Sequence, residues 1–118
     1  MPLVSVTTSA PDPGAAVRET FLGQLSRAAA EGLGKPEAYV MTALQAGVAM
    51  TFAGDAAPAC LVDLRNIGAL APERTAALTE RLCALVTQWL AIPANRTYVG
   101  FTEVERHLWG WDGRTFAR

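Results

Sequence analysis

The chain is poor in side chains that exchange protons or bind metals near neutral pH. Its 118 residues include one His and two Cys, and its ten basic residues comprise nine Arg and a single Lys, Lys35. Cys60 and Cys83 form no C-x-x-C pair, so we expect two reduced thiols and neither a metal site nor a cofactor. Acid–base schemes that use His or several Lys side chains therefore lack their usual residues.

An excess of charge of one sign is also missing. Ten basic and 11 acidic residues give a formal net charge of -1, which argues against a nucleic-acid binder. No apolar run approaches the roughly 20 residues of a membrane helix. The first residues lack a basic stretch followed by an apolar one, so we expect a cytoplasmic protein for which any secretion is unconventional. With 51% hydrophobic residues, residues 1–118 are expected to form a single domain.

The first half of the chain has the pattern of a strand, a helix and a second strand. Alternating β-branched residues predict a strand over 3–8. A helix is expected to follow an N-cap at Asp12 and to end at Gly34. Residues 39–44 are the second strand candidate, and the loop after them contains a short edge strand at 50–52.

The same pattern recurs in the second half. A strand is predicted over 60–67, a helix opens at Pro72 and ends before Pro93, and a strand follows over 97–101. The chain therefore reads as a doubled strand–helix–strand unit. Each unit gives a parallel pair through a right-handed crossover, which predicts a four-stranded sheet with both helices on one face.

The opposite face of this sheet lacks cover in a single chain. We expect it to carry apolar residues at Val4, Val6, Val40, Thr42 and Leu61. An uncovered apolar face predicts a homo-oligomer. The aromatic tail over 108–116 contains Asp112-Gly113, which favours a small hairpin; its rings either pack against the body of the domain or line a pocket or an interface.

Six short blocks follow one another along nearly the whole chain. They are Met1-Pro2, G-K-P-x-x-Y-V-M at 34–41, M-T-F-A-G at 50–54, N-I-G at 66–68, P-x-N-R-x-Y at 93–98 and W-G-W-D-G-x-T-F at 109–116. Together they resemble the macrophage migration inhibitory factor (MIF) family of the tautomerase superfamily. The resemblance implies an α+β fold of doubled β-α-β units with a four-stranded mixed sheet, two helices on one face, and assembly as a homotrimer.

The resemblance also implies a catalytic N-terminal proline, Pro2, exposed by removal of Met1. Keto–enol tautomerisation needs one base that takes a proton and returns it elsewhere. A free α-amine titrates nearer neutrality than Lys, and an apolar pocket with a nearby cation lowers the pKa of an amine further. By the same resemblance, Lys35 binds the substrate carboxylate and the backbone N–H of Ile67 helps to hold the substrate.

Five aromatic residues match positions in or near the pocket of the family, although packing in the core is an equally good interpretation for each: Tyr39, Tyr98, Trp109, Trp111 and Phe116. The resemblance implies that Tyr98 comes from a neighbouring subunit, so that the pocket lies between subunits. Two positions depart from the mammalian members, since Gly100 replaces an Asn and Trp109 replaces a small aliphatic residue. The mammalian C-x-x-C is absent as well.

These residues favour a keto–enol tautomerase of phenylpyruvate-type and dopachrome-like substrates, which are small aromatic keto or enol acids. Pro2 is then the general base. The alternative is a cytokine-like or effector protein that acts by binding a receptor, with little or no physiological catalysis. A third hypothesis is another reaction of the superfamily, such as decarboxylation or dehalogenation, in which Pro2 acts as a cationic acid.

Overall fold

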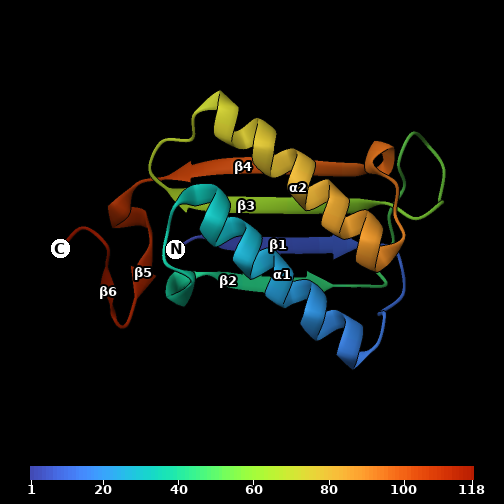
Figure 1. Ribbon diagram of the computed structural model, residues 1–118, viewed down its shortest axis with the longest axis horizontal. Helices are drawn as coiled ribbons and strands as arrows, with labels where there is room; N and C mark the ends of the chain where they lie inside the picture. Colours follow the sequence, from blue (N-terminus) through green and yellow to red (C-terminus); the bar gives the residue numbers. More distant parts are fainter.

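Two helices pack against one face of a four-stranded sheet in the computed structural model, which describes residues 1–118 (Figure 1). The elements are β1 (Leu3–Thr8), α1 (Ala15–Leu33), β2 (Met41–Gln45), β3 (Cys60–Ile67), α2 (Pro72–Leu90) and β4 (Thr97–Val104). The sheet order is β2-β1-β3-β4, with β1–β2 and β3–β4 parallel and β1–β3 antiparallel. The predicted doubled β-α-β unit with a mixed sheet is confirmed. Neither helix combines the length and the hydropathy needed to span a bilayer.

The hydrophobic core lies between the helices and the sheet. Alternate side chains of the two central strands are fully buried: Val4 and Val6 from β1, and Val62 and Leu64 from β3. Helix α2 buries Leu78, Leu82 and Val86, which recur every four residues on one face. The helices approach closely at Gly32, where a Cβ atom would overlap the side chain of Leu78. The absence of a side chain at Gly32 thus leaves room for Leu78 at this helix crossing.

The sheet face turned away from the helices carries different residues from those expected. Val4 and Val6 were wrongly assigned to it, because the even positions of β1 face the helices. The hydroxyl of Thr42 donates to the Leu22 carbonyl of α1, and Val40 packs against the core, so neither lies on this face. The large apolar side chains exposed here include Met41 (67% exposed), Leu61 (42%) and Tyr98 (66%). Of the five expected residues only Leu61 is confirmed.

The start of α1 also differs from the prediction. The N-cap residue is Gly14, with φ 96°, and no side chain caps the helix. Asp12 is not the cap: one carboxylate oxygen accepts from the Gly14 N–H at 2.8 Å and the other from Arg18 Nη1 at 2.6 Å. Asp12 stabilises the turn before the helix, and the hydrogen bond from Gly14, followed by the Arg18 contact, lowers its pKa.

Three strand boundaries shift. Residues Glu37–Tyr39 form a 3-10 turn, so β2 starts at Met41 and not at residue 39. The expected edge strand at 50–52 is wrong, because only an isolated bridge joins Phe52 to Asp55. Strand β4 continues to Val104, since all eight of its residues have partners in β3.

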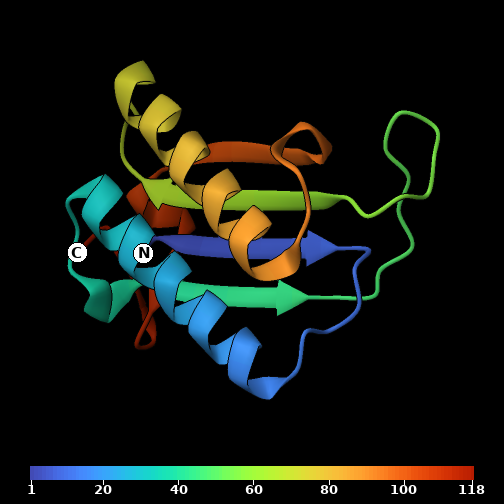
Figure 2. The same ribbon diagram turned by 45° about the vertical axis from the view of Figure 1, so that its right-hand side comes forward.

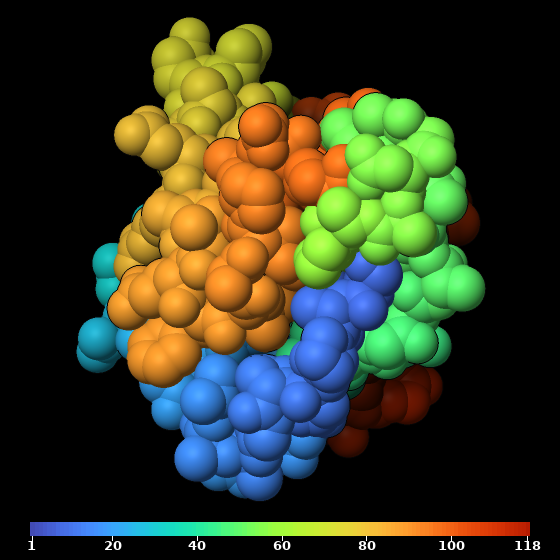
Figure 3. Space-filling model, turned by 90° about the vertical axis from the view of Figure 1, so that its right-hand side faces the viewer, coloured from blue at the N-terminus to red at the C-terminus, as the bar shows by residue number.

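The two ends of the sheet are closed by different segments. At one end, the loop after β2 lies beside the segment that follows α2 (Figure 3). Arg96 of the 3-10 turn Ala94–Arg96 holds it there by donating to the carbonyls of Ala57 and Pro58 and pairing with Asp55. At the other end lies the C-terminal hairpin, after a 3-10 turn over Arg106–Leu108. This hairpin has strands β5 (Gly110–Trp111) and β6 (Arg114–Thr115) with positive φ at both intervening residues, as the Asp-Gly pair predicts.

The residue that caps the C-terminal end of α2 has a strained backbone. Ala91 has φ 56°, a left-handed conformation that disfavours a side chain. The equivalent residue after α1 is Gly34. Ala91→Gly is therefore expected to raise the free energy of unfolding by about 1 kcal/mol, measured by urea denaturation. Ala77→Gly, in the exposed interior of α2, should lower it by about 1 kcal/mol. A loss of stability in Ala91→Gly would contradict the assigned strain.

Candidate active site

The sheet topology brings four strand ends to one edge. Because β1 and β2 run opposite to β3 and β4, the amino ends of the first pair lie beside the carboxyl ends of the second (Figure 1). Pro2 directly precedes β1 and Ile67 ends β3. Lys35 follows Gly34, whose left-handed conformation ends α1 and lets the Lys35 N–H bond to Ala30. The C-terminal hairpin lies at the same edge (Figure 2).

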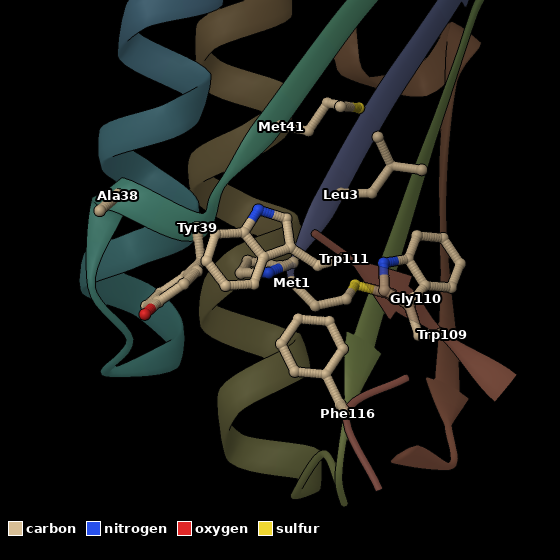
Figure 4. Close-up of a pocket in the computed structure, with 10 residues that line it drawn as sticks. Met1, Leu3, Ala38, Tyr39, Met41, Trp109, Gly110, Trp111 and Phe116 are labelled. Carbon is tan, nitrogen blue, oxygen red and sulfur yellow. The ribbon is translucent and has the colours of Figure 1, made fainter. Parts of the chain in front are cut away.

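An apolar cavity of about 310 Å³ opens at this edge. It is lined by Met1, Pro2, Leu3, Ala38, Tyr39, Met41, Trp109, Gly110, Trp111 and Phe116. Figure 4 shows Met1 lying among the aromatic side chains of the hairpin. The ring of Tyr39 meets that of Trp111 edge to face, with centroids 5.5 Å apart, and Trp111 stacks at 6.5 Å on Phe116. The cavity is therefore suited to a flat apolar group.

A second cavity of about 350 Å³ adjoins the first and includes basic side chains in its lining. Met1, Tyr39 and Phe116 line both, so the two form one site with an apolar half and a cationic half. Lys35 and Arg106 line the cationic half. The Lys35 ammonium donates to the Ile67 carbonyl at 2.7 Å, which holds it at the end of β3.

The amino end of the chain lies in this site with little access to water. Met1 is 9% exposed and Pro2 behind it is fully buried. Burial, and then the positive charge of Lys35, lower the pKa of the Met1 amine from its ordinary value of 8.0. Burial, and then Arg106, lower the pKa of Lys35 as well. An amine in this place is therefore kept neutral more readily than one in water.

Seven of the eight candidate residues meet at this site: Pro2, Lys35, Tyr39, Ile67, Trp109, Trp111 and Phe116. Tyr98 does not. Its register partner is Leu61, which pairs with Thr7, so Tyr98 lies five residues, or about 17 Å along the strand direction, from Pro2 and two strands to the side. There its ring packs at 5.1 Å against Phe52.

Sequence reasoning missed three residues at this edge. Arg106 lines the cationic half and Met41 lines the apolar half. Asn66 is 3% exposed, and its side-chain oxygen has no hydrogen-bond partner. Leu3 pairs with Arg65 in the antiparallel ladder of β1 and β3. Continuing this register by one residue toward the amino end of β1 places Asn66 opposite Pro2. Asn66 belongs to the N-I-G block at 66–68 and points inward in the alternation of β3, but neither signal gave it a role.

The two thiols have no part in the site. Cys60 is buried in the core and Cys83 is half-buried on α2. Burial, and then the nearby Cys83, raise the pKa of Cys60 to about 12, and burial raises that of Cys83. Both thiols are therefore protonated at neutral pH, as expected of reduced structural cysteines.

The doubled β-α-β fold, with an aromatic-lined site around a buried amino terminus, is the architecture of the tautomerase superfamily. The family model described as macrophage migration inhibitory factor (MIF) matches residues 1–117, and the chain belongs to this family. This membership supports an isomerase of the tautomerase type or a cytokine-like role in general terms.

Curated and solved relatives match over nearly the full chain. A macrophage migration inhibitory factor homolog from Brugia malayi is 34% identical over 117 residues, covering 99% of this chain and 100% of its own. The rat macrophage migration inhibitory factor is 32% identical with the same coverage. The crystal structure of a homologue from Prochlorococcus marinus is 47% identical with a TM-score of 0.91, covering 98% of this chain and 99% of its own.

Proposed function

We propose that this protein, after removal of Met1, is a keto–enol tautomerase of phenylpyruvate-type and dopachrome-like acids with the Pro2 amine as general base. The observation that carries the proposal is the environment of the amino terminus. It is buried against aromatic rings beside the only Lys of the chain, and both effects lower the pKa of an amine. A neutral amine at this point can accept a proton near physiological pH.

The proposed reaction moves one proton without an external reactant. The neutral Pro2 nitrogen takes a proton from the carbon next to the substrate carbonyl, and the C–H electron pair forms the enol double bond. The protonated Pro2 nitrogen then returns this proton to the carbonyl oxygen, which becomes the enol hydroxyl, and the amine is neutral again. The ammonium of Lys35 binds the substrate carboxylate, and the backbone N–H of Ile67 helps to hold it. The unpartnered Asn66 oxygen, opposite Pro2, is available to the protonated amine.

The apolar half of the site takes the aromatic ring of the substrate. Tyr39, Trp109, Trp111 and Phe116 supply flat surfaces at spacings that suit ring packing. In the unprocessed chain the Met1 side chain occupies this region (Figure 4). Its removal would therefore both free the amine of Pro2 and enlarge the cavity.

The test is the ultraviolet absorbance of enol-phenylpyruvate with a preparation whose mass verifies Pro2 as the first residue. We expect ketonisation with saturation kinetics, faster than the buffer-catalysed rate. A rate equal to that of buffer would reject the enzymatic proposal. A pH–rate profile that rises as the amine loses its proton distinguishes a base from the cationic acid of other superfamily reactions.

We further propose that the active form is a homotrimer in which Tyr98 of one subunit completes the site of another. The uncovered sheet face, with Met41, Leu61 and Tyr98 exposed, supports self-association. Light scattering should give three times the 12.5 kDa chain mass. Tyr98→Ala should lower kcat/KM about tenfold by removing an aromatic wall, on the scale of one aromatic contact.

Mixed subunits test the sharing of Tyr98 directly. Tyr98→Ala chains supply an intact Pro2, and Pro2→Gly chains supply an intact Tyr98. When the two variants are refolded together, some sites combine Pro2 from a Tyr98→Ala chain with Tyr98 from a Pro2→Gly chain. The activity of the mixture should then exceed the mean of the two variants refolded separately. An activity equal to that mean would show that each site is built from one chain.

A cytokine-like role is the second candidate, because the names of the rat and Brugia malayi relatives describe an effect on macrophage migration. On this reading the same surface recognises a receptor, with little or no physiological catalysis. Receptor binding that survives Pro2→Gly, and release into culture medium without cell lysis, would support it. Loss of both would favour the enzymatic role.

A further inference from the structure

The cationic half of the site holds more positive charge than one carboxylate needs. Lys35, Arg106 and Arg118 all line this cavity, and no Asp or Glu does. Lys35 comes from the end of α1, Arg106 follows β4, and Arg118 follows the C-terminal hairpin. Three separate elements therefore direct positive charge at one space, next to a wall formed by Phe116.

No Asp or Glu side chain pairs with Lys35, Arg106 or Arg118. Lys35 donates to a neutral carbonyl, that of Ile67. Arg106 and Arg118 likewise form no ion pair with a carboxylate side chain, whereas six other pairs of side chains do. Arg118 lies instead over the rings of Trp111 and Phe116, at 5.6 and 5.5 Å from their centroids.

The two carboxylates nearest in the chain to Arg106 are engaged elsewhere. Glu103 and Glu105 line an adjoining groove with Arg106, not the cavity itself. The Glu103 carboxylate accepts from the Leu70 N–H at 2.7 Å, and that of Glu105 lies 3.3 Å from His107 Nδ1. Arg106 is close enough to Lys35 to lower its pKa, so the two cations repel each other. An anion bound between them would relieve this repulsion.

We propose that this site prefers aromatic dicarboxylates, with one carboxylate on Lys35, the second on Arg106, and the ring among Trp109, Trp111 and Phe116. The guanidinium of Arg106 presents a planar fork that matches a carboxylate, whereas Lys35 acts as a point charge. Both carboxylates lie at the cationic end of such a ligand and the ring at the apolar end. The corresponding substrate is an aromatic 2-oxo acid with a second carboxylate near its 2-oxo acid group; this substrate role, but not the binding preference, rests on the proposed function.

A matched pair of ligands tests the preference. Benzylmalonate and 3-phenylpropanoate share a benzyl group and differ by one carboxylate on the same carbon. Their dissociation constants are measured by calorimetry on the processed chain, at a pH where every carboxylate is ionised. Benzylmalonate should bind about tenfold more tightly, as expected of one added charge-assisted contact.

Arg106→Gln should abolish this difference and leave the affinity for 3-phenylpropanoate within about twofold, since one carboxylate still binds Lys35. Arg106→Lys should retain part of the preference, because the charge stays and the fork is lost. Arg27→Gln is the matched control. Arg27 is exposed on α1, where it pairs with Glu31 at 3.6 Å, and its substitution should leave the tenfold ratio unchanged.

Two results would overturn the proposal. One is equal or weaker binding of benzylmalonate by the unsubstituted chain. The other is a ratio that persists in Arg106→Gln. Calorimetry does not depend on turnover, so a chain that binds benzylmalonate as expected but does not ketonise enol-phenylpyruvate would reject the proposed reaction and keep the binding preference. Conversely, a chain that ketonises enol-phenylpyruvate normally but does not bind benzylmalonate more tightly would reject the binding preference and keep the proposed reaction.

Discussion

Pro2→Gly should lower kcat/KM for enol-phenylpyruvate about 100-fold, within the range of a lost or misplaced general base. Glycine keeps an amine at the chain end but loses the pyrrolidine ring, which is fully buried in the structure. The amine then gains rotational freedom and no longer faces the substrate carbon in one orientation. Steady-state kinetics on preparations of verified mass measure this change.

The control for Pro2→Gly is a substitution on the exposed side of α1. Glu19→Gln lies there, near the start of the helix, and should leave kcat/KM unchanged within about twofold, as a surface change distant from the site. If Pro2→Gly retained an activity within a factor of about three of the unsubstituted chain, far short of the loss expected for a general base, Pro2 would not be that base.

Lys35→Gln should change both substrate binding and the pH dependence. Loss of the ammonium removes the carboxylate anchor, so KM should rise about tenfold, the scale of one charged hydrogen bond. Burial, and then Lys35, lower the pKa of the Met1 amine, and we expect Lys35 to act in the same direction on the Pro2 amine that processing exposes. Without Lys35 the amine pKa should rise, and because only the neutral amine is a base, the acidic limb of kcat/KM should move to higher pH.

Lys35→Arg separates the two effects, because it keeps the positive charge and changes the geometry. Its acidic limb should stay close to that of the unsubstituted chain, even if its KM rises. An acidic limb that does not move in Lys35→Gln would mean that Lys35 does not set the pKa of the catalytic amine. The pH profile of each variant, measured at constant ionic strength, decides this.

The order of the elements could be predicted because its signals are local. Helical spacing of apolar residues and prolines or glycines at the ends mark both helices, and the Asp112-Gly113 pair marks the hairpin. The inward face of β1 could not be predicted. Apolar side chains occur at both odd and even positions of β1, as Leu3, Val4 and Val6 show. Only the position of the helices shows that the even-numbered side chains point into the core.

The site was partly predictable for a different reason. Pro2 and Lys35 stand out as the amino terminus and the single Lys, and the family resemblance gives them roles. Arg106 is one of nine Arg with no local pattern, and only the fold brings it from the end of β4 to Lys35. The proposed role of Tyr98 requires a neighbouring subunit, because within one chain Tyr98 lies at the far end of the sheet. Its role in the site stays a prediction.

The most direct test of the central role of the Pro2 amine is activity as a function of Met1 removal. In the unprocessed chain the Pro2 nitrogen is part of a peptide bond, so its lone pair is delocalised and cannot act as a base. A chain that retains Met1 is treated with methionine aminopeptidase for increasing times, and each sample is analysed by mass spectrometry and by the enol-phenylpyruvate assay. We predict activity proportional to the fraction that begins at Pro2, extrapolating to zero for the unprocessed chain. Full activity of the chain that retains Met1 would contradict the account.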